Sequence, residues 1–136
     1  MVKSGSCLCG EVQVEVSGDP IFVIACHCIK CQKRTGSPLG ITCFFPESAV
    51  KVSGELKDYQ RGSDSGREIT HHFCSTCGTQ ALSRTPAVPN CIGISSGVFD
   101  DTTWIKPQMH AYTKTKMSCI EIPEGTMAFD ETPQSK

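Results

Sequence analysis

Short stretches of the chain alternate between hydrophobic and polar residues, which is the pattern of a β-strand with one buried face. The clearest stretch is residues 11–16, where Val12, Val14 and Val16 share one face and the residues between them are polar. Similar short apolar runs recur along the chain, and Gly, Pro, Ser and Asp separate them. We expect further strands at residues 21–25, 41–45, 49–52, 56–59, 68–73, 79–82, 91–94, 109–112 and 119–122.

Helical periodicity is weak by comparison, because no segment keeps a period of about 3.6 residues over three turns. The polar and basic residues 32–37, with Gly36 near their end, predict a short helical turn or loop. Residues 61–66 contain no apolar side chain and predict a loop. The pattern therefore predicts a mainly β protein built from many short strands.

Composition narrows the picture. A length of 136 residues favours one domain, and 13 basic against 14 acidic residues leave a net charge of −1 that does not favour a nucleic-acid or membrane surface. No apolar run approaches the roughly 20 residues that a transmembrane helix needs. The first motif begins within seven residues of Met1, which leaves no room for a signal peptide. We therefore expect a cytoplasmic protein in a reducing compartment.

Ten cysteines are many for a chain of this length in such a compartment. Seven of them are closely spaced, in the patterns Cys7-x-Cys9, Cys26-x-Cys28-x-x-Cys31 and Cys74-x-x-Cys77. Disulfides need Cα atoms about 5.5 Å apart and suitably directed side chains, which residues two or three apart rarely offer. The spacing therefore favours metal binding over disulfides.

The pattern Cys74-x-x-Cys77-Gly78 is typical of a zinc knuckle, in which two sulfurs meet one ion and glycine allows the backbone to reverse. Such a knuckle needs a second pair of ligands. Cys7 and Cys9 can supply it, because residues two apart on an extended strand face the same way. Together the two pairs predict a closed site with four thiolate ligands. Closed sites of this kind are structural.

This grouping leaves Cys26, Cys28 and Cys31 together. Three thiolates leave one coordination position for water or substrate, which is the arrangement that a catalytic zinc needs. An alternative grouping places Cys28 and Cys31 with the first pair, but it strands Cys26 and leaves the knuckle without partners. The remaining cysteines lie in apolar strand contexts, where we expect small buried side chains, although any one could be a fourth ligand of the open site. These are Cys43, Cys91 and Cys119.

The cysteine motifs resemble those of the glutathione-dependent formaldehyde-activating enzyme family, whose domain also occurs in centromere-protein-V-like proteins. The resemblance is carried by Gly5-Ser6-Cys7-Leu8-Cys9-Gly10, Cys26-His27-Cys28-x-x-Cys31 and Phe73-Cys74-x-x-Cys77-Gly78, and extends to Lys33, Gly54-x-Leu56 and Pro107-x-x-His110. It covers residues 5 to about 129 and implies one domain over 5–129, with a tail at 130–136. The chain departs from the family at Met117-Ser118-Cys119, where members commonly carry Pro-Trp.

The resemblance implies a β-tent fold, a zinc-binding arrangement of many short antiparallel strands, with two zinc ions per chain. Its structural zinc would be held by Cys7, Cys9, Cys74 and Cys77, and its catalytic zinc by Cys26, Cys28 and Cys31. The implied activity is that of a carbon–sulfur lyase. In the family's reaction glutathione adds to formaldehyde to give S-hydroxymethylglutathione, and the reverse step cleaves the carbon–sulfur bond.

Substrate contacts are less clear from the residues. Lys33 and Arg34 follow the cluster and could bind the carboxylates of glutathione, Arg34 with the better bidentate geometry, although a solvated basic turn is the other interpretation. His110 could line the pocket or be a hydrogen-bonded core histidine. His27 lies between two expected ligands and could point away from the metal.

Two other functions remain open at this point. A non-catalytic protein-binding module would use both zinc ions for stability alone. A redox enzyme would need Cys91 or Cys119 as an exposed thiol of low pKa, and the apolar neighbours of both residues argue against this. The sequence does not indicate an oligomeric state.

Overall fold

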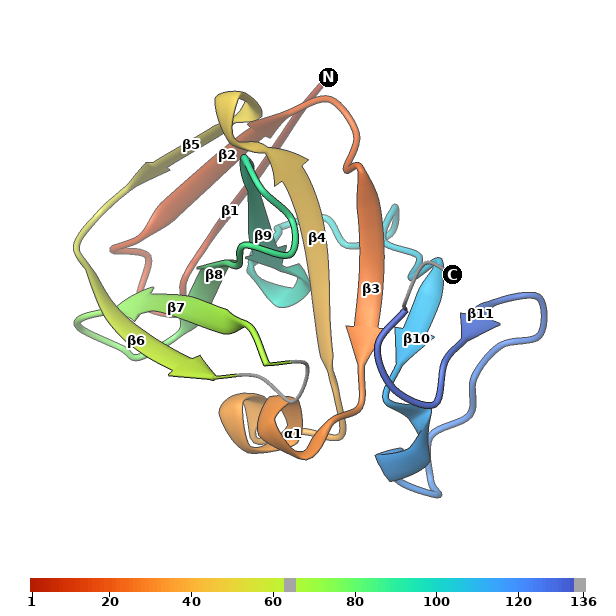
Figure 1. Cartoon of the computed structure of the whole chain (residues 1–136). Helices are drawn as coiled ribbons and strands as arrows, with labels where there is room; N and C mark the ends of the chain where they lie inside the picture. The colour runs from red at the N-terminus through yellow and green to blue at the C-terminus, as the bar shows by residue number, and fades with distance from the viewer. Residues whose placement is uncertain (63–65, 134–136) are drawn as a thin grey trace.

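The computed structural model describes residues 1–62 and 66–133, which form two β-sheets (Figure 1). The smaller sheet has the strand order β1-β2-β5, and both of its strand pairs are antiparallel. Its strands are β1 (Val2–Ser6), β2 (Gln13–Ser17) and β5 (Val50–Ser53). The alternation in the sequence explains β2, because Val14 and Val16 are buried while Gln13 and Glu15 are exposed. The sequence did not predict β1.

The larger sheet has eight strands in the order β11-β10-β3-β4-β9-β8-β7-β6. They are β3 (Phe22–Cys26), β4 (Gly40–Pro46), β6 (Leu56–Gly62), β7 (Glu68–Cys74), β8 (Gln80–Arg84), β9 (Cys91–Ser95), β10 (Met109–Ala111) and β11 (Met127–Ala128). From β3 through β6 all neighbouring strands are antiparallel. At the other edge β10 pairs with both β3 and β11 in parallel. The mainly β prediction is confirmed, and the sheet is mixed rather than wholly antiparallel.

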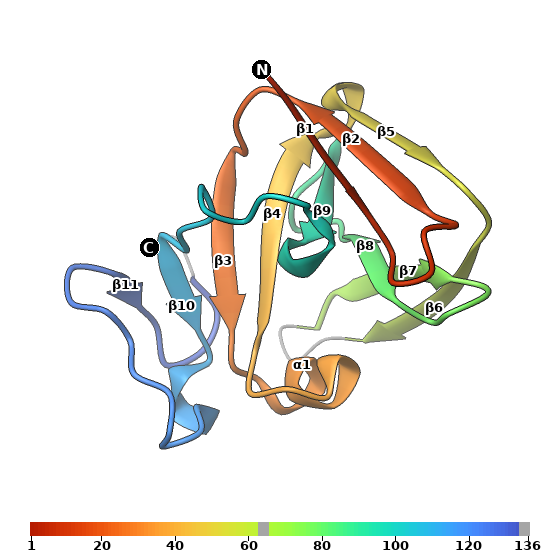
Figure 2. The ribbon, with the colours of Figure 1, turned by 180° about the vertical axis from the view of Figure 1, so that it is seen from behind.

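The parallel edge results from long connections. Parallel neighbours cannot be joined by a tight hairpin, so the chain must cross over between them. After β9 the chain crosses the molecule and then forms β10, which pairs with β3, as the two opposite views show (Figures 1 and 2). A prediction was wrong here: residues 119–122 form a turn and irregular chain, and the last strand is β11.

The core lies between the two sheets. The buried valines of β2 belong to the same cluster as Cys43 and Phe45 of β4 and Ile94 of β9. Trp104 borders this cluster, with its ring centroid 5.0 Å from that of Phe99. Burial of these apolar side chains is the main force that holds the small sheet on the large one.

At Gly5, β1 lies close against the backbone of Val98, which follows β9. A Cβ at this position would lie 2.0 Å from the carbonyl oxygen of Val98, a contact that no side chain can make. Gly5 also forms an isolated bridge with Phe99. The absence of a side chain at residue 5 therefore brings β1 against the backbone that follows β9.

The main helix, α1 (Ile29–Thr35), follows β3 directly. It begins at Cys28, whose sulfur accepts a hydrogen bond from the Cys31 amide, and it ends at Gly36 in the left-handed conformation (φ 66°). The predicted helical turn at residues 32–37 is thus confirmed but begins earlier. Short 3₁₀ turns occur at Glu47–Ala49, Ser96–Val98 and Thr113–Thr115.

The predicted loop at residues 61–66 falls partly outside the described residues. Arg61 and Gly62 belong to β6, and residues 63–65 are not described. Among the described residues, the helices are too short and too polar to pass through a lipid bilayer.

Candidate metal centres and the adjoining pocket

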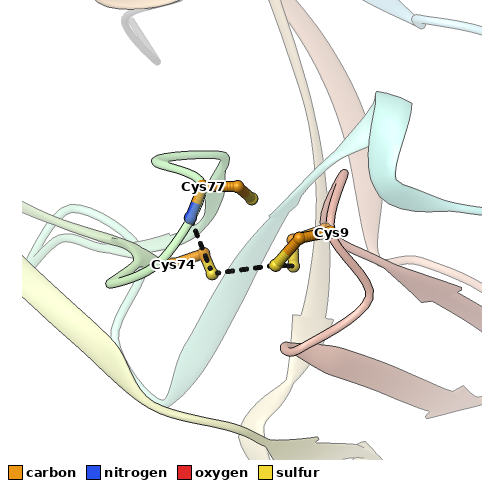
Figure 3. A group of neighbouring side chains, drawn as sticks. Cys9, Cys74 and Cys77 are labelled. Atoms are coloured by element: carbon orange, nitrogen blue, oxygen red, sulfur yellow. Dashed lines mark hydrogen bonds between the residues drawn. The ribbon is translucent and has the colours of Figure 1, made fainter.

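Four cysteines from two distant parts of the chain meet at the junction of the two sheets. The sulfur atoms of Cys7, Cys9, Cys74 and Cys77, which we call the four-cysteine group, all lie within 4.8 Å of one another. Figure 3 shows Cys9 facing Cys74 and Cys77 across this junction, with 3.8 Å between the sulfurs of Cys9 and Cys74. The group can hold a metal ion, and it has the grouping predicted from the spacing.

The local backbone differs from the sequence prediction. Cys7 and Cys9 lie in a turn between β1 and β2 rather than on an extended strand. In this turn the amide of Gly10 donates to the carbonyl oxygen of Cys7, and the Cys7 amide donates to Val12. Their sulfurs nevertheless lie 3.6 Å apart, because the turn curls the chain around a common point.

Backbone amides point at the sulfurs of the four-cysteine group. Val12 donates to Cys7 at 3.2 Å, and the amides of Thr76 and Cys77 both donate to Cys74 at 3.4 Å. Hydrogen bonds from Thr79 lower the pKa of the Cys77 thiol to about 5. Such donors stabilise thiolates, which are the form that binds metal.

The second group lies where β3 passes into α1. The sulfurs of Cys26, Cys28 and Cys31, which we call the three-cysteine group, also lie within 4.8 Å of one another. Cys28 and Cys31 are buried, and Cys26 is partly exposed. In the described part of the chain, no fourth Cys, His, Asp or Glu completes this set. The donors fit a tetrahedral ion with one position left for another ligand.

The three remaining cysteines lie outside both groups. Cys43 is fully buried, as predicted, and burial raises the pKa of its thiol to about 12. Cys91 is only partly buried, and Cys119 is exposed in a turn, so the prediction of a buried strand position for Cys119 was wrong.

The surroundings of the three-cysteine group favour a thiolate at Cys31. Hydrogen bonds from the Cys26 and Cys28 thiols lower the pKa of Cys31 far below its usual value, and the neighbouring Arg34 guanidinium lowers it further. Cys26, for the same reason, keeps its proton, since a second thiolate beside the first is unfavourable. A bound divalent cation would offset the repulsion between neighbouring thiolates, so that all three sulfurs could be deprotonated.

His27, between two of these cysteines, faces another histidine. Its Nε2 lies 2.8 Å from Nδ1 of His110, and the two rings stack with centroids 5.1 Å apart. Both side chains are buried, and burial lowers the pKa of each, so the pair is neutral. The His27 carbonyl accepts hydrogen bonds from Gln32 and Thr115. The pair ties the cysteine segment to β10.

A cavity of about 640 Å³ opens beside α1, and we call it the basic pocket. It is lined by Lys30, Lys33, Arg34, Tyr59, Arg61, Gly62, His71, Phe73, Gly78 and Gln80. Its described lining includes two lysines and two arginines but no acidic residue. Lys33 and Arg34, which the sequence offers as substrate contacts, both line this pocket. His110 does not line this pocket, so its predicted substrate contact gains no support from its position.

Several lining residues were not foreseen. Arg61 donates from Nε to Nε2 of His71 at 3.0 Å, which leaves the ring proton of His71 on Nδ1. Gln80 accepts a hydrogen bond from Nη1 of Arg34. These side chains come from β6, β7 and β8, so nothing in the local sequence around α1 could have indicated them.

Comparison with known proteins agrees with the cysteine motifs. The family described as glutathione-dependent formaldehyde-activating enzyme matches residues 2–115, a segment that contains both cysteine groups. The chain belongs to this family. The family segment ends before β11, so the last strand lies beyond the matched residues.

A solved structure supports the fold. The crystal structure of a Rhodobacter sphaeroides protein matches with a TM-score of 0.57 and 24% sequence identity. The match covers 76% of this chain and 91% of that chain. At this identity the likeness concerns the fold alone.

Proposed function

We propose that the protein is a zinc-dependent carbon–sulfur lyase that interconverts glutathione plus formaldehyde with S-hydroxymethylglutathione. The observation that carries this proposal is a three-cysteine group with no fourth ligand among the described residues, at the start of the helix α1 whose Lys30, Lys33 and Arg34 line the basic pocket. In the forward direction a bond forms between the thiol sulfur and the carbonyl carbon, and the thiol proton ends on the oxygen. Family membership supports the reaction class.

The donor chemistry of the three-cysteine group fits zinc, since thiolates are among its preferred ligands. Bound at Cys26, Cys28 and Cys31, zinc would lower the pKa of an incoming thiol and hold it as the nucleophilic thiolate. The four-cysteine group, which is closed, would hold a structural zinc, giving two ions per chain. A cytoplasmic location suits this chemistry, because glutathione keeps cysteines reduced there.

The basic pocket supports glutathione as the thiol. Glutathione carries two carboxylates, and the described lining offers cations without competing acidic groups. Lys33 is exposed at the pocket, and Lys30 lies one turn of α1 before it with its ammonium 3.3 Å from the Gly62 carbonyl oxygen. We assign carboxylate binding to these lysines together with Arg61.

The test compares two cysteine variants of zinc-loaded protein. We expect Cys28→Ser to bind one zinc and to lose catalysed exchange between glutathione and its hydroxymethyl adduct, measured by NMR above the uncatalysed rate. Cys119→Ser is the matched control, because Cys119 is exposed and belongs to neither group. It should bind two zinc ions and exchange at the wild-type rate.

Exchange that survives in Cys28→Ser would contradict the catalytic assignment. If wild-type protein binds two zinc ions but accelerates no thiol–aldehyde exchange, and its cobalt-substituted form shows no spectral response to glutathione, the chain is a binding module instead.

A further inference from the structure

The Arg34 guanidinium borders the basic pocket, but protein groups hold it on several sides. Its Nη1 donates a hydrogen bond to the side-chain oxygen of Gln80 on β8. Its Nε is buried and has no hydrogen-bond partner in the described part of the chain. Its Nη2 lies against Gly40, where a Cβ would come within 2.5 Å of it. A guanidinium whose N–H groups face protein atoms on these sides is poorly placed to bind a substrate carboxylate with two parallel hydrogen bonds.

The position of Gly40 shows what the guanidinium faces. Gly40 is the first residue of β4 and lies opposite Cys26 in the ladder between β3 and β4. Arg34 itself lies one helical turn after Cys31 on α1, so the two side chains share a face of the helix. Two independent geometric relations, the strand register and the helical spacing, therefore place this cation at the three-cysteine group.

The charge of the group explains why a fixed cation belongs there. Three thiolates and a divalent ion carry a net charge of −1, and an incoming thiolate raises this to −2. Anionic charge in a partly buried site is costly unless a cation lies close by. Arginine suits this role because its guanidinium stays charged at every working pH.

We propose that Arg34 is a positioning residue for the three-cysteine group, which Gln80 and the missing side chain at Gly40 hold beside the sulfurs to offset their negative charge. This inference rests on one part of the proposed function, the binding of a metal ion at the three-cysteine group. It does not depend on the reaction that the group catalyses. It separates Arg34 from Lys33, since the substrate contact then belongs to the lysine and not to the arginine.

The experiment follows zinc release to a chelator from the two-zinc protein, where each group gives its own kinetic phase. Residues that support metal ligands typically change metal affinity by 10- to 100-fold. We expect Arg34→Met to accelerate zinc release from the three-cysteine group by roughly 10-fold or more. Release from the four-cysteine group should keep its wild-type rate. Arg34→Lys, which keeps the charge but loses the planar fork, should fall between Arg34→Met and wild type.

Lys33→Met is the matched control, because it removes a cation from the neighbouring position on the same helix. It should leave both release phases at wild-type rates, whatever it does to the KM for glutathione. Gly40→Ala provides a second route, since the added methyl displaces the guanidinium without removing its charge. It should accelerate the same phase as Arg34→Met, and it tests the idea even if Arg34→Met does not fold.

The outcomes separate this inference from the proposed function. If both phases of Arg34→Met equal those of wild type while the KM for glutathione rises, Arg34 is a carboxylate ligand and the inference is overturned. Equal acceleration in Arg34→Met and Lys33→Met would overturn it as well. Wild-type protein that releases two zinc ions but never acts on glutathione would refute only the proposed function.

Discussion

The protonation of His71 is fixed by its surroundings in the basic pocket. The side chain is only 6% exposed, and Arg61 donates to its Nε2 at 3.0 Å. Burial, followed by the charges of Arg34 and Arg61, lowers the pKa of His71 to about 4. The imidazole is therefore neutral at physiological pH, with its proton on Nδ1.

This lowered pKa predicts a pH dependence of stability. Between about pH 6.5 and 4 the unfolded chain protonates His71 while the native state does not, so the free energy of unfolding falls as the pH falls. After discounting for solvent near the pocket, the loss is roughly 1 to 3 kcal/mol. Urea unfolding of wild type and His71→Asn at pH 7.5 and 5 measures it.

Asparagine keeps a side-chain N–H donor but cannot titrate, so His71→Asn should lose less stability than wild type over this range. Any zinc that acidification releases would leave both proteins alike, so the difference between their profiles isolates the histidine. Parallel pH profiles for the two proteins would show that His71 is not held neutral in the native state.

Gly5 carries a second prediction at the scale of one residue. Gly5→Ala forces a methyl group against the Val98 carbonyl oxygen and should lower the free energy of unfolding by about 2 kcal/mol or more. Gly97→Ala is the control, since Gly97 is exposed and a Cβ there has no neighbour within 4 Å. Denaturant unfolding measures the free energy of unfolding of both variants. Equal values for Gly5→Ala and Gly97→Ala would show that the contact at Gly5 tolerates a methyl group.

Among the elements, β11 contrasts with the strands that the sequence predicted. The strands around residues 11–16 and 68–73 carry alternating or apolar patterns that predict them locally. A strand of only two residues has no period to detect. Main-chain hydrogen bonds hold it instead, from Met127 to Gln108 and from Phe129 to His110.

Deletion of residues 126–136 tests this element. The deletion removes these bonds and the one from Thr113 to Phe129, so amides around β10 should exchange hydrogen faster. Hydrogen exchange followed by mass spectrometry would detect the change in peptides that span residues 108–116. Peptides spanning residues 2–17 serve as the internal control. Unchanged protection around β10 would mean that β11 contributes nothing to the edge of the sheet.

At the scale of the whole molecule, the two cysteine groups differ in what they connect. The four-cysteine group joins a turn of the small sheet to the hairpin between β7 and β8 of the large sheet. The three-cysteine group lies within six consecutive positions. Metal at the first group therefore closes a long loop of chain, whereas metal at the second closes a short one.

We expect Cys74→Ser to unfold the protein at a much lower temperature than wild type in the presence of zinc, because metal binding at the closed group stabilises the native state. Cys28→Ser, with one ligand lost from the open group, should lower the melting temperature far less. Differential scanning calorimetry makes the comparison, with Cys119→Ser as the reference for a cysteine outside both groups. Equal losses in Cys74→Ser and Cys28→Ser would remove the distinction between a structural and a catalytic centre.

The sequence by itself determined the features that local pattern encodes. Alternation placed most strands, and the short spacings gathered the cysteines into candidate groups, because residues two or three apart cannot be far from each other in space. Elimination also paired Cys7 and Cys9 with the Cys74 knuckle, a grouping that the structure brings together.

Tertiary structure decided what no local pattern specifies. The mixed edge at β10, the contact between His27 and His110, and the lining of the basic pocket all join residues far apart in the chain. These contacts depend on strand register and crossovers, which long-range packing sets. For the same reason the sequence favoured Arg34 over Lys33 as a carboxylate ligand, whereas the contacts of Arg34 with Gln80 and Gly40 appear only in the folded chain.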